Sequence, residues 1–198
     1  MGRIIVEQIV TADGYAAEPD GGIGFFENAR SVNDADQEQL RLLDSVRAIV
    51  LGRRTYDMFA AYWPDMDPVQ EPVAAPINAT PKYVVSNTLE TAPWGERGDT
   101  AGVLRGDGVE SLRNLRARVD GDIIVWGSLT LADALLRAGE VGMLRLRIVP
   151  VLIGAGRSFS PSDLGQRALV LERAASYPSG VVVLQYGFAP TMHDAGRA

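Results

Sequence analysis

The feature that most constrains the fold of this chain is an apolar strand that enters a helix through a single glycine, and it occurs twice. In the first copy, the apolar residues 48–51 are followed by Gly52 and then by residues 53–55, Arg-Arg-Thr. In the second copy, residues 122–126 are followed by Gly127 and Ser128. Buried strands that turn directly into helices are typical of α/β proteins with a largely parallel sheet. The two junctions therefore predict an α/β fold.

The first junction also has the chemistry of an anion-binding site. The start of a helix offers unpaired N–H groups and the positive end of its dipole, and Gly52 lets a ligand approach the backbone because it has no Cβ. Arg53 and Arg54 are cations that oppose the helix dipole, so an anionic partner explains them better than a solvated surface does. For Gly127 and Ser128, a tight turn is the alternative. Together the junctions predict a ligand with more than one phosphate.

Composition narrows the possible functions. The 198 residues are 46% hydrophobic and 22% charged, which is typical of a globular protein. We expect one domain over residues 1–189 and a polar tail over 190–198. The net charge of -6 disfavours a nucleic-acid partner. Cysteine is absent, so thiolate chemistry is excluded. The single histidine, His193, lies near the polar C-terminal end, which disfavours a Ser-His-Asp triad and excludes a multi-histidine metal site. Without a long apolar run or a signal-peptide pattern, we expect a cytoplasmic protein with no membrane partner.

The hydrophobic pattern predicts alternating strands and helices. The expected strands are residues 3–10, 48–51, 82–86, 102–105, 122–126, 143–151, 169–171 and 181–186. The expected helices are residues 34–46, 54–62, 109–119 and 128–138. Residues 20–26 form a glycine-rich loop, and residues 64–81, with five prolines, an extended loop. This order predicts a mostly parallel sheet with helices on both faces and an antiparallel pair at one edge.

The order and spacing of these motifs resemble a known family. The motifs are Thr-Ala-Asp-Gly at 11–14, Gly-Arg-Arg-Thr-Tyr at 52–56, Lys-Tyr-Val-Val-Ser at 82–86, Trp-Gly-Ser at 126–128 and Leu-Arg-Ile-Val-Pro-Val-Leu-Ile-Gly-Ala-Gly at 146–156. Over residues 3–188 they resemble the dihydrofolate reductase fold, in the branch related to the C-terminal reductase domain of bifunctional riboflavin-biosynthesis deaminase-reductases. The resemblance implies a dihydrofolate reductase-like α/β fold, an NADPH cofactor and a homodimer.

The resemblance also implies which residues contact NADPH. Those matched to its phosphate-bearing parts are Gly52, Arg53, Arg54, Thr55, Ser86, Asn87, Arg105, Gly127, Ser128, Leu129 and Thr130. Within this set, Ser86 and Asn87 match the place that holds the 2′-phosphate. Thr11, Ala12 and Asp13 would border the nicotinamide. Read from the residues alone, Ser86 and Asn87 are also compatible with a capped turn, and Arg105 with a solvated surface.

Two further residues are candidates for the chemistry itself. Asp13 is the best-placed early acid for supplying a proton near the nicotinamide, and its alternative role is a turn residue beside Gly14. Trp126 ends a buried strand next to the second glycine, where it either belongs to the core or lines a substrate pocket.

The sequence thus leads to one main hypothesis and two alternatives. The main one is an NADPH-dependent reductase acting on a small heterocyclic substrate, such as a pterin, pyrimidine or flavin precursor, or on a carbonyl compound. A non-catalytic dinucleotide-binding or sensing protein with the same pocket is the first alternative, since histidine and cysteine are scarce or absent. A structural dimer scaffold without nucleotide affinity is the second.

Overall fold

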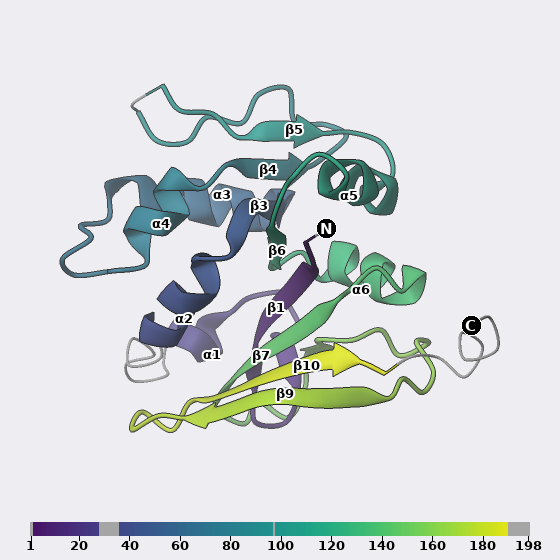
Figure 1. Cartoon of the computed structure of the whole chain (residues 1–198). Helices are drawn as coiled ribbons and strands as arrows, with labels where there is room; N and C mark the ends of the chain where they lie inside the picture. The colour runs from purple at the N-terminus through teal and green to yellow at the C-terminus, as the bar shows by residue number, and fades with distance from the viewer. Residues whose placement is uncertain (1, 28–35, 97, 190–198) are drawn as a thin grey trace.

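The computed structural model describes residues 2–27, 36–96 and 98–189, which form a large, mostly parallel sheet flanked by helices (Figure 1). The eight strands of this sheet run in the order β5-β4-β3-β6-β1-β7-β10-β9. Their bounds are β1 Ile4–Thr11, β3 Val46–Gly52, β4 Lys82–Val85, β5 Gly102–Leu104, β6 Asp122–Trp126, β7 Met143–Val149, β9 Leu169–Ser176 and β10 Val182–Phe188. The first six strands in the order are parallel, and β10 and β9 form the antiparallel edge.

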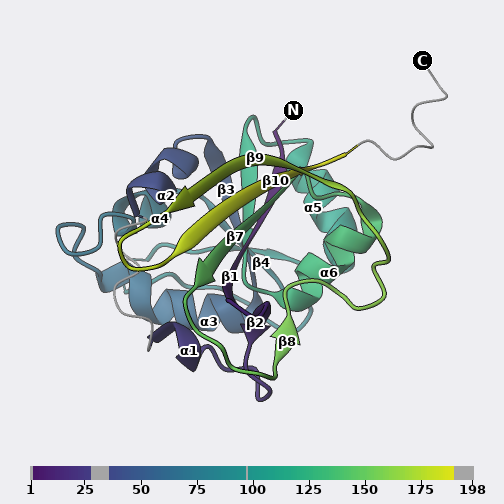
Figure 2. The same ribbon diagram turned by 90° about the horizontal axis from the view of Figure 1, so that it is seen from below.

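Helices cover both faces of the sheet (Figures 1 and 2). One face carries α2 (Asp36–Leu43), α3 (Arg53–Tyr62) and α4 (Ala74–Ala79), and the other carries α5 (Gly108–Arg116) and α6 (Leu129–Ala138). The predicted fold class, dihydrofolate reductase-like with a mostly parallel sheet and an antiparallel edge, is therefore confirmed.

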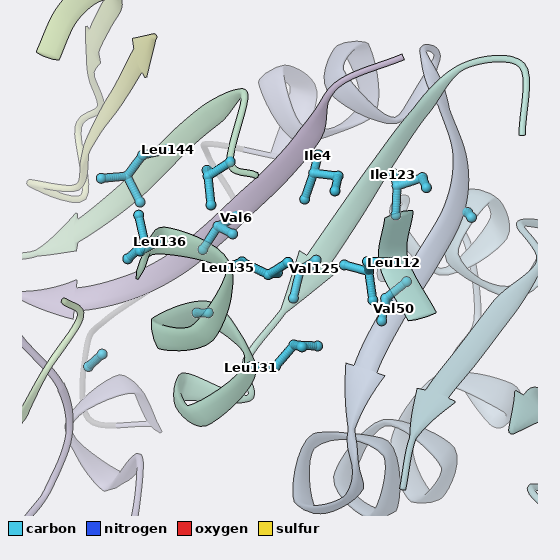
Figure 3. Close-up of a cluster of buried hydrophobic side chains, with 14 of the residues drawn as sticks. Ile4, Val6, Val50, Leu112, Ile123, Val125, Leu131, Leu135, Leu136 and Leu144 are labelled. Atoms are coloured by element: carbon cyan, nitrogen blue, oxygen red, sulfur yellow. The ribbon is translucent and has the colours of Figure 1, made fainter. Parts of the chain in front are cut away.

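The core consists of apolar side chains that alternate between the two faces of the central strands. On the α5–α6 side, leucines of the two helices pack against apolar side chains of the strands (Figure 3). The buried residues of this cluster include Ile4, Val6, Val50, Leu112, Ile123, Val125, Leu131, Leu135 and Leu136. On the other side, Ile5, Ile49 and Ile124 pack beneath α2, α3 and α4. Each buried Leu or Ile stabilises the fold by roughly 1.5–3 kcal/mol.

The helix predicted over residues 34–46 is shorter in the structure. Helix α2 spans Asp36–Leu43, and Val46 already belongs to β3, opposite Asp122 of β6. The β-branched Val46 is better suited to a strand than to the end of a helix. Residues 34 and 35 lie outside the described part of the chain.

The proline-rich segment 64–81 is not wholly extended, so that prediction was wrong. It contains the end of a 3-10 helix, Trp63–Asp65, and the whole of α4. Pro64 and Pro76 lie in the first turns of these helices, where the missing N–H has no intrahelical partner to lose. Prolines therefore begin helical turns here.

Three smaller features were also not predicted. Strand β9 continues from residue 171 to Ser176, past a bulge at Glu172 that the alternating apolar pattern did not reveal. A short helix, α1 (Gly24–Glu27), forms within the glycine-rich loop. Strands β2 (Tyr15–Ala17) and β8 (Arg157–Ser158) form a separate two-stranded sheet. In the described chain no helix combines the length and hydrophobicity needed to cross a bilayer.

Candidate functional site

Most of the residues predicted to bind a ligand follow strands that end at the same edge of the sheet. Along this edge the strands lie in the order β5, β4, β3, β6 and β1. Their carboxyl ends carry Arg105 after β5, Ser86 and Asn87 after β4, Gly52 to Thr55 at β3, Gly127 to Thr130 after β6, and Thr11 and Ala12 at β1. With neighbouring strands about 4.8 Å apart, the row is roughly 19 Å long. Such an edge suits an elongated ligand lying across several strands.

The two glycine junctions interlock at the centre of this edge. Strands β3 and β6 are neighbours, with Leu51 opposite Trp126. A Cβ on Gly52 would lie 2.3 Å from Ser128 Oγ, and one on Gly127 would lie 2.2 Å from Thr55 Oγ1. The Ser128 N–H donates to Thr55 Oγ1 at 3.2 Å. Both positions therefore require glycine because the first turns of α3 and α6 touch.

The backbone of the second junction is held in a rarely occupied conformation. Gly127 has φ 62°, and Ser128 has φ 43° and ψ 66°. Ser128 is the one non-glycine residue with positive φ in the described ranges. A left-handed conformation at a non-glycine residue costs about 1–3 kcal/mol and is concentrated at functional sites. The Ser128 hydroxyl accepts from Leu131 N at 3.4 Å and so caps α6.

The first junction leaves its helix start open. Gly52 is the N-cap of α3 and provides no side-chain cap, so N–H groups of the first turn have no side-chain acceptor there. Arg53 pairs with Asp57 at 2.9 Å on the exposed surface. Arg54 has no hydrogen-bond or ion-pair partner among the residues that the structure describes. Its Nη1 would lie 3.0 Å from a Cβ on Gly21, so the glycine-rich loop lies beside this unpaired guanidinium.

The residues that follow β4 and β5 are hydrogen-bonded to one another. Arg105 donates to the carbonyls of Asn87 at 3.2 Å and Leu89 at 2.8 Å, and Asn87 Oδ1 accepts from Gly106 N at 2.7 Å. Ser86 Oγ accepts from Leu89 N at 3.1 Å. These contacts are those of a capped turn, the alternative considered for Ser86 and Asn87. A ligand contact at Ser86, Asn87 or Arg105 stays a prediction.

Asp13 connects two loops at the other end of the row. Its Oδ2 accepts from Gly154 N at 2.8 Å and from Ile153 N at 3.2 Å, which ties the turn after β1 to the loop after β7. A hydrogen bond from the Thr11 side chain, helped by these backbone N–H groups, lowers the pKa of Asp13. The carboxylate is therefore charged near neutral pH, which favours a structural acceptor over a proton donor. Its catalytic role stays a prediction.

Trp126 belongs to a buried polar network that the sequence did not reveal. Its Nε1 donates to Glu7 Oε1 at 2.9 Å, and its ring packs 5.7 Å from that of Phe59. The other oxygen of Glu7 pairs with Arg145, which is completely buried and also donates to Gln39 of α2. Arg145 alternates with Leu144 and Leu146 along β7, a pattern typical of a solvated face, but α2 covers that side. The one sign of this network in the sequence was Glu7, a charged residue within the largely apolar strand β1.

The network continues to the surface through Glu38. Arg145 Nη2 lies 3.7 Å from Glu38 Oε1, and Arg173 Nε lies 3.1 Å from the same oxygen. Tyr177 donates its hydroxyl to the other oxygen of Glu38. Although burial acts to raise it, the hydrogen bonds from Tyr177 and Arg173 and the charge of Arg145 lower the pKa of Glu38. Burial, and then the bond to Glu38, raises the pKa of Tyr177 to about 12.

The raised pKa of Tyr177 gives a pH prediction. Above about pH 10 an unfolded tyrosine begins to lose its proton, whereas folded Tyr177 keeps it until about pH 12. The stability that Tyr177 contributes is therefore complete below pH 10 and is lost as the pH rises towards 12. Tyrosinate absorbance of the native protein, compared with that of Tyr177→Phe, should show one group titrating near pH 12. A missing difference between the two titrations would contradict the hydrogen bond to Glu38.

The chain matches the family described as the RibD C-terminal domain over residues 3–183. It is 27% identical over 188 residues to the uncharacterized protein YyaP of Bacillus subtilis (strain 168), covering 93% of this chain and 94% of that protein.

Solved structures share the fold at low sequence identity. A putative riboflavin biosynthesis protein from Shewanella sp. PV-4 has a TM-score of 0.75 at 21% identity, covering 95% of this chain and 99% of the other. Dihydrofolate reductase from Enterococcus faecalis, complexed with NADP(H), has a TM-score of 0.62 at 11% identity, covering 96% and 98%. These likenesses establish a dihydrofolate reductase-like fold, and the family match covers nearly the whole chain. This protein therefore belongs to the RibD C-terminal domain family.

Proposed function

We propose that this protein is an NADPH-dependent reductase that transfers a hydride to a small heterocyclic substrate of the pterin, pyrimidine or flavin-precursor kind, or to a carbonyl compound. The observation on which this depends is the interlocked pair of junctions at Gly52 and Gly127, with the unpaired Arg54 beside the uncapped start of α3. Family membership and the fold shared with an NADP(H)-bound reductase support the assignment.

The residues at the edge fit a dinucleotide phosphate. A Cβ at Gly52 or Gly127 would collide with the facing helix start, so glycine at both positions lets the two helix starts pack side by side, where their N–H groups could hold one phosphate-bearing ligand. Arg54 supplies a cation whose guanidinium can pair bidentately with phosphate oxygens. In this arrangement Gly52, Arg54 and the turn at Gly127 would hold the phosphates, while Thr11 and Ala12 would border the nicotinamide.

The chain's own residues would mainly position the reactants. NADPH would supply the hydride when bound. Trp126, held by Glu7, would form a fixed wall beside the reacting rings, and the rigid edge of the sheet would set their distance. Because its pKa is lowered, Asp13 is a weak proton source near neutral pH. We therefore assign the proton to water, with Asp13 holding the two loops that shield the site.

Replacing Arg54 should lower the affinity for NADPH more than the affinity for NADH. We expect Arg54→Ala to weaken NADPH by about 10- to 100-fold, since one charge-assisted contact contributes about 1.5–3 kcal/mol. NADH, which lacks the 2′-phosphate, should be weakened much less. Isothermal titration calorimetry with both cofactors measures the two constants.

Arg53→Ala is the matched control for this prediction. Arg53 is adjacent, equally charged and already paired with Asp57, so its loss should change the affinity for either cofactor only slightly. If Arg54→Ala weakened NADPH and NADH equally, Arg54 would contact the pyrophosphate that both share. If it weakened neither, the guanidinium would not be a phosphate ligand.

A non-catalytic dinucleotide-binding or sensing protein is the second candidate function. It is favoured by the lowered pKa of Asp13, which leaves the described edge without an identified proton-donating side chain. Oxidation of NADPH, followed by absorbance with a panel of pterins, pyrimidines, flavin precursors and carbonyl compounds, decides between the two. Turnover with any compound supports the reductase. Tight cofactor binding without turnover across the panel supports the sensor.

We also propose that the protein is a cytoplasmic homodimer. Strand β9 forms one edge of the sheet and exposes Leu169, Val170 and Leu171 by 40%, 53% and 54%. Consecutive exposed apolar residues on an open edge are characteristic of an interaction surface. Light scattering of the purified chain should give twice the mass of 21.3 kDa, and a monomer would contradict the proposal.

A further inference from the structure

The buried polar network occupies one row across the sheet. Trp126 of β6, Glu7 of β1 and Arg145 of β7 are register partners in turn, so their side chains stand on the same face. Gln39 of α2 lies above them and accepts from Arg145. The row lies at the level of the second glycine junction, since Trp126 directly precedes Gly127 and Gln8 Nε2 donates to the Gly127 carbonyl at 3.2 Å. The network is therefore adjacent to the proposed cofactor edge.

Packing alone does not account for this network. A buried ion pair is often no more stabilising than apolar residues of the same volume, and apolar side chains surround the network on this face, which also carries the pair of Arg147 with Asp36. Moreover, Arg145 Nε, Arg145 Nη2 and Gln39 Nε2 are buried and make no hydrogen bond to the residues that the structure describes. Arg145 Nη2 still faces the carboxylate of Glu38 at 3.7 Å, so Arg145 Nε and Gln39 Nε2 are the two donors left without a partner. Buried polar atoms are almost always paired, so two unpaired donors in one place call for a specific explanation.

The two unpaired atoms define the ligand chemistry that would satisfy them. Both are N–H donors, so they require an acceptor. The network is charge-balanced, with Glu7 and Glu38 against Arg145 and Arg173, so it offers no excess charge to an anion. A neutral acceptor, such as a ring carbonyl oxygen, fits better than a phosphate or a carboxylate.

We propose that Gln39 and Arg145 determine substrate specificity by donating hydrogen bonds to a carbonyl oxygen on the ring of the substrate, while Glu7 positions Trp126 beside it. This inference rests on the proposed reductase function and extends it to the polar edge of the substrate. Because the donor atoms are buried, ligand contact requires α2 to shift away from the sheet. Such a shift would be the conformational response to substrate.

A matched pair of ring compounds tests the proposal. Lumazine carries two ring carbonyls, and 2,4-diaminopteridine has the same bicyclic ring with amino groups in their place. In the presence of saturating NADP⁺, we expect the native protein to bind lumazine about tenfold more tightly, since sites built to hydrogen-bond a ligand strongly reject analogues that leave their groups unpaired. Calorimetry measures both affinities. Equal affinities, or tighter binding of the diamino compound, would overturn the proposal.

The variant Gln39→Glu tests whether Gln39 is one of the donors to the substrate carbonyl. It keeps the oxygen that accepts from Arg145 and replaces the unpaired Nε2 by an acceptor, so the preference should fall to unity or reverse. Gln37→Glu makes the same charge change at an exposed position of α2 and should leave the tenfold preference intact. An unchanged preference in a folded Gln39→Glu protein would refute the assignment.

The same samples distinguish this inference from the proposed function. If NADP⁺ itself gives no heat of binding, the reductase proposal fails. If NADP⁺ binds and the lumazine preference is absent, only the assignment of Gln39 and Arg145 fails. The dissociation constant for NADP⁺ should be the same in the native, Gln39→Glu and Gln37→Glu proteins, because neither glutamine lies at the proposed phosphate-binding residues.

Discussion

Replacing Arg145 by methionine should destabilise the protein by about 3–5 kcal/mol, because it leaves the carboxylate of Glu7 buried without its cation. Arg145 is completely buried, Glu7 is only 5% exposed, and the two form a direct ion pair. For a domain of this size, the loss is a large fraction of the total free energy of unfolding. Urea unfolding followed by circular dichroism measures the change.

Two further variants separate an unpaired charge from a general packing defect. In Glu7→Gln with Arg145→Met, no buried charge is orphaned and Trp126 keeps an acceptor, so most of the loss should be recovered. Arg3→Met removes an arginine from an exposed pair with Glu172, whose partners are 44% and 38% exposed, and should cost less than about 1 kcal/mol. A double variant as unstable as Arg145→Met alone would show that packing, rather than charge, dominates.

A methyl group at position 52 should disrupt the cofactor edge. The Cβ of Gly52→Ala would lie 2.3 Å from Ser128 Oγ and 2.5 Å from Ser128 Cβ, so the starts of α3 and α6 must separate. We expect a loss of about 1–3 kcal/mol in stability, as for other overpacked sites. The affinity for NADPH should fall by more than tenfold, because the separated turns no longer fit one ligand. Thermal unfolding and calorimetry measure the two effects.

The clash can be removed from the opposite side. Ser128→Gly deletes the Oγ and Cβ that the new methyl group would meet, and glycine tolerates the φ of 43° better than serine does. Alone, it loses only the side-chain cap of α6, which costs a few tenths of a kcal/mol. Combined with Gly52→Ala, it should restore both stability and NADPH binding. A lack of rescue would mean that Gly52 is needed for another reason.

The two glycine junctions were the part of the candidate site that the sequence predicted best. Gly52 and Gly127 each end an apolar strand, and the carboxyl ends of parallel strands meet at one edge. Local pattern therefore predicted these two junctions, whereas most other residues along the edge were named through the family resemblance, and their contact with a cofactor stays a prediction. The sequence analysis did not distinguish the two arginines; in the structure Arg53 pairs with Asp57, four residues further along α3, and Arg54 has no partner among the described residues.

The polar network could not be predicted from the sequence because it depends on which strands become neighbours. Glu7, Trp126 and Arg145 are far apart in the chain and meet only through the order β6-β1-β7. Arg145 and Arg147 alternate with apolar residues, which by itself indicates a solvated face. Helix α2 covers that face, so Arg145 is buried instead. The proline-rich segment is similar, because α4 forms where Ile77 packs against the core.

The sequence by itself determined the fold class and the glycine junctions at its edge, because strand, helix and turn preferences act over a few neighbouring residues. The tertiary structure alone decided that the two junctions interlock. It also decided that one donor of Gln39 and one of Arg145 are buried without partners. These properties arise from contacts between residues distant in sequence, and their energies depend on burial and on the partners that packing supplies.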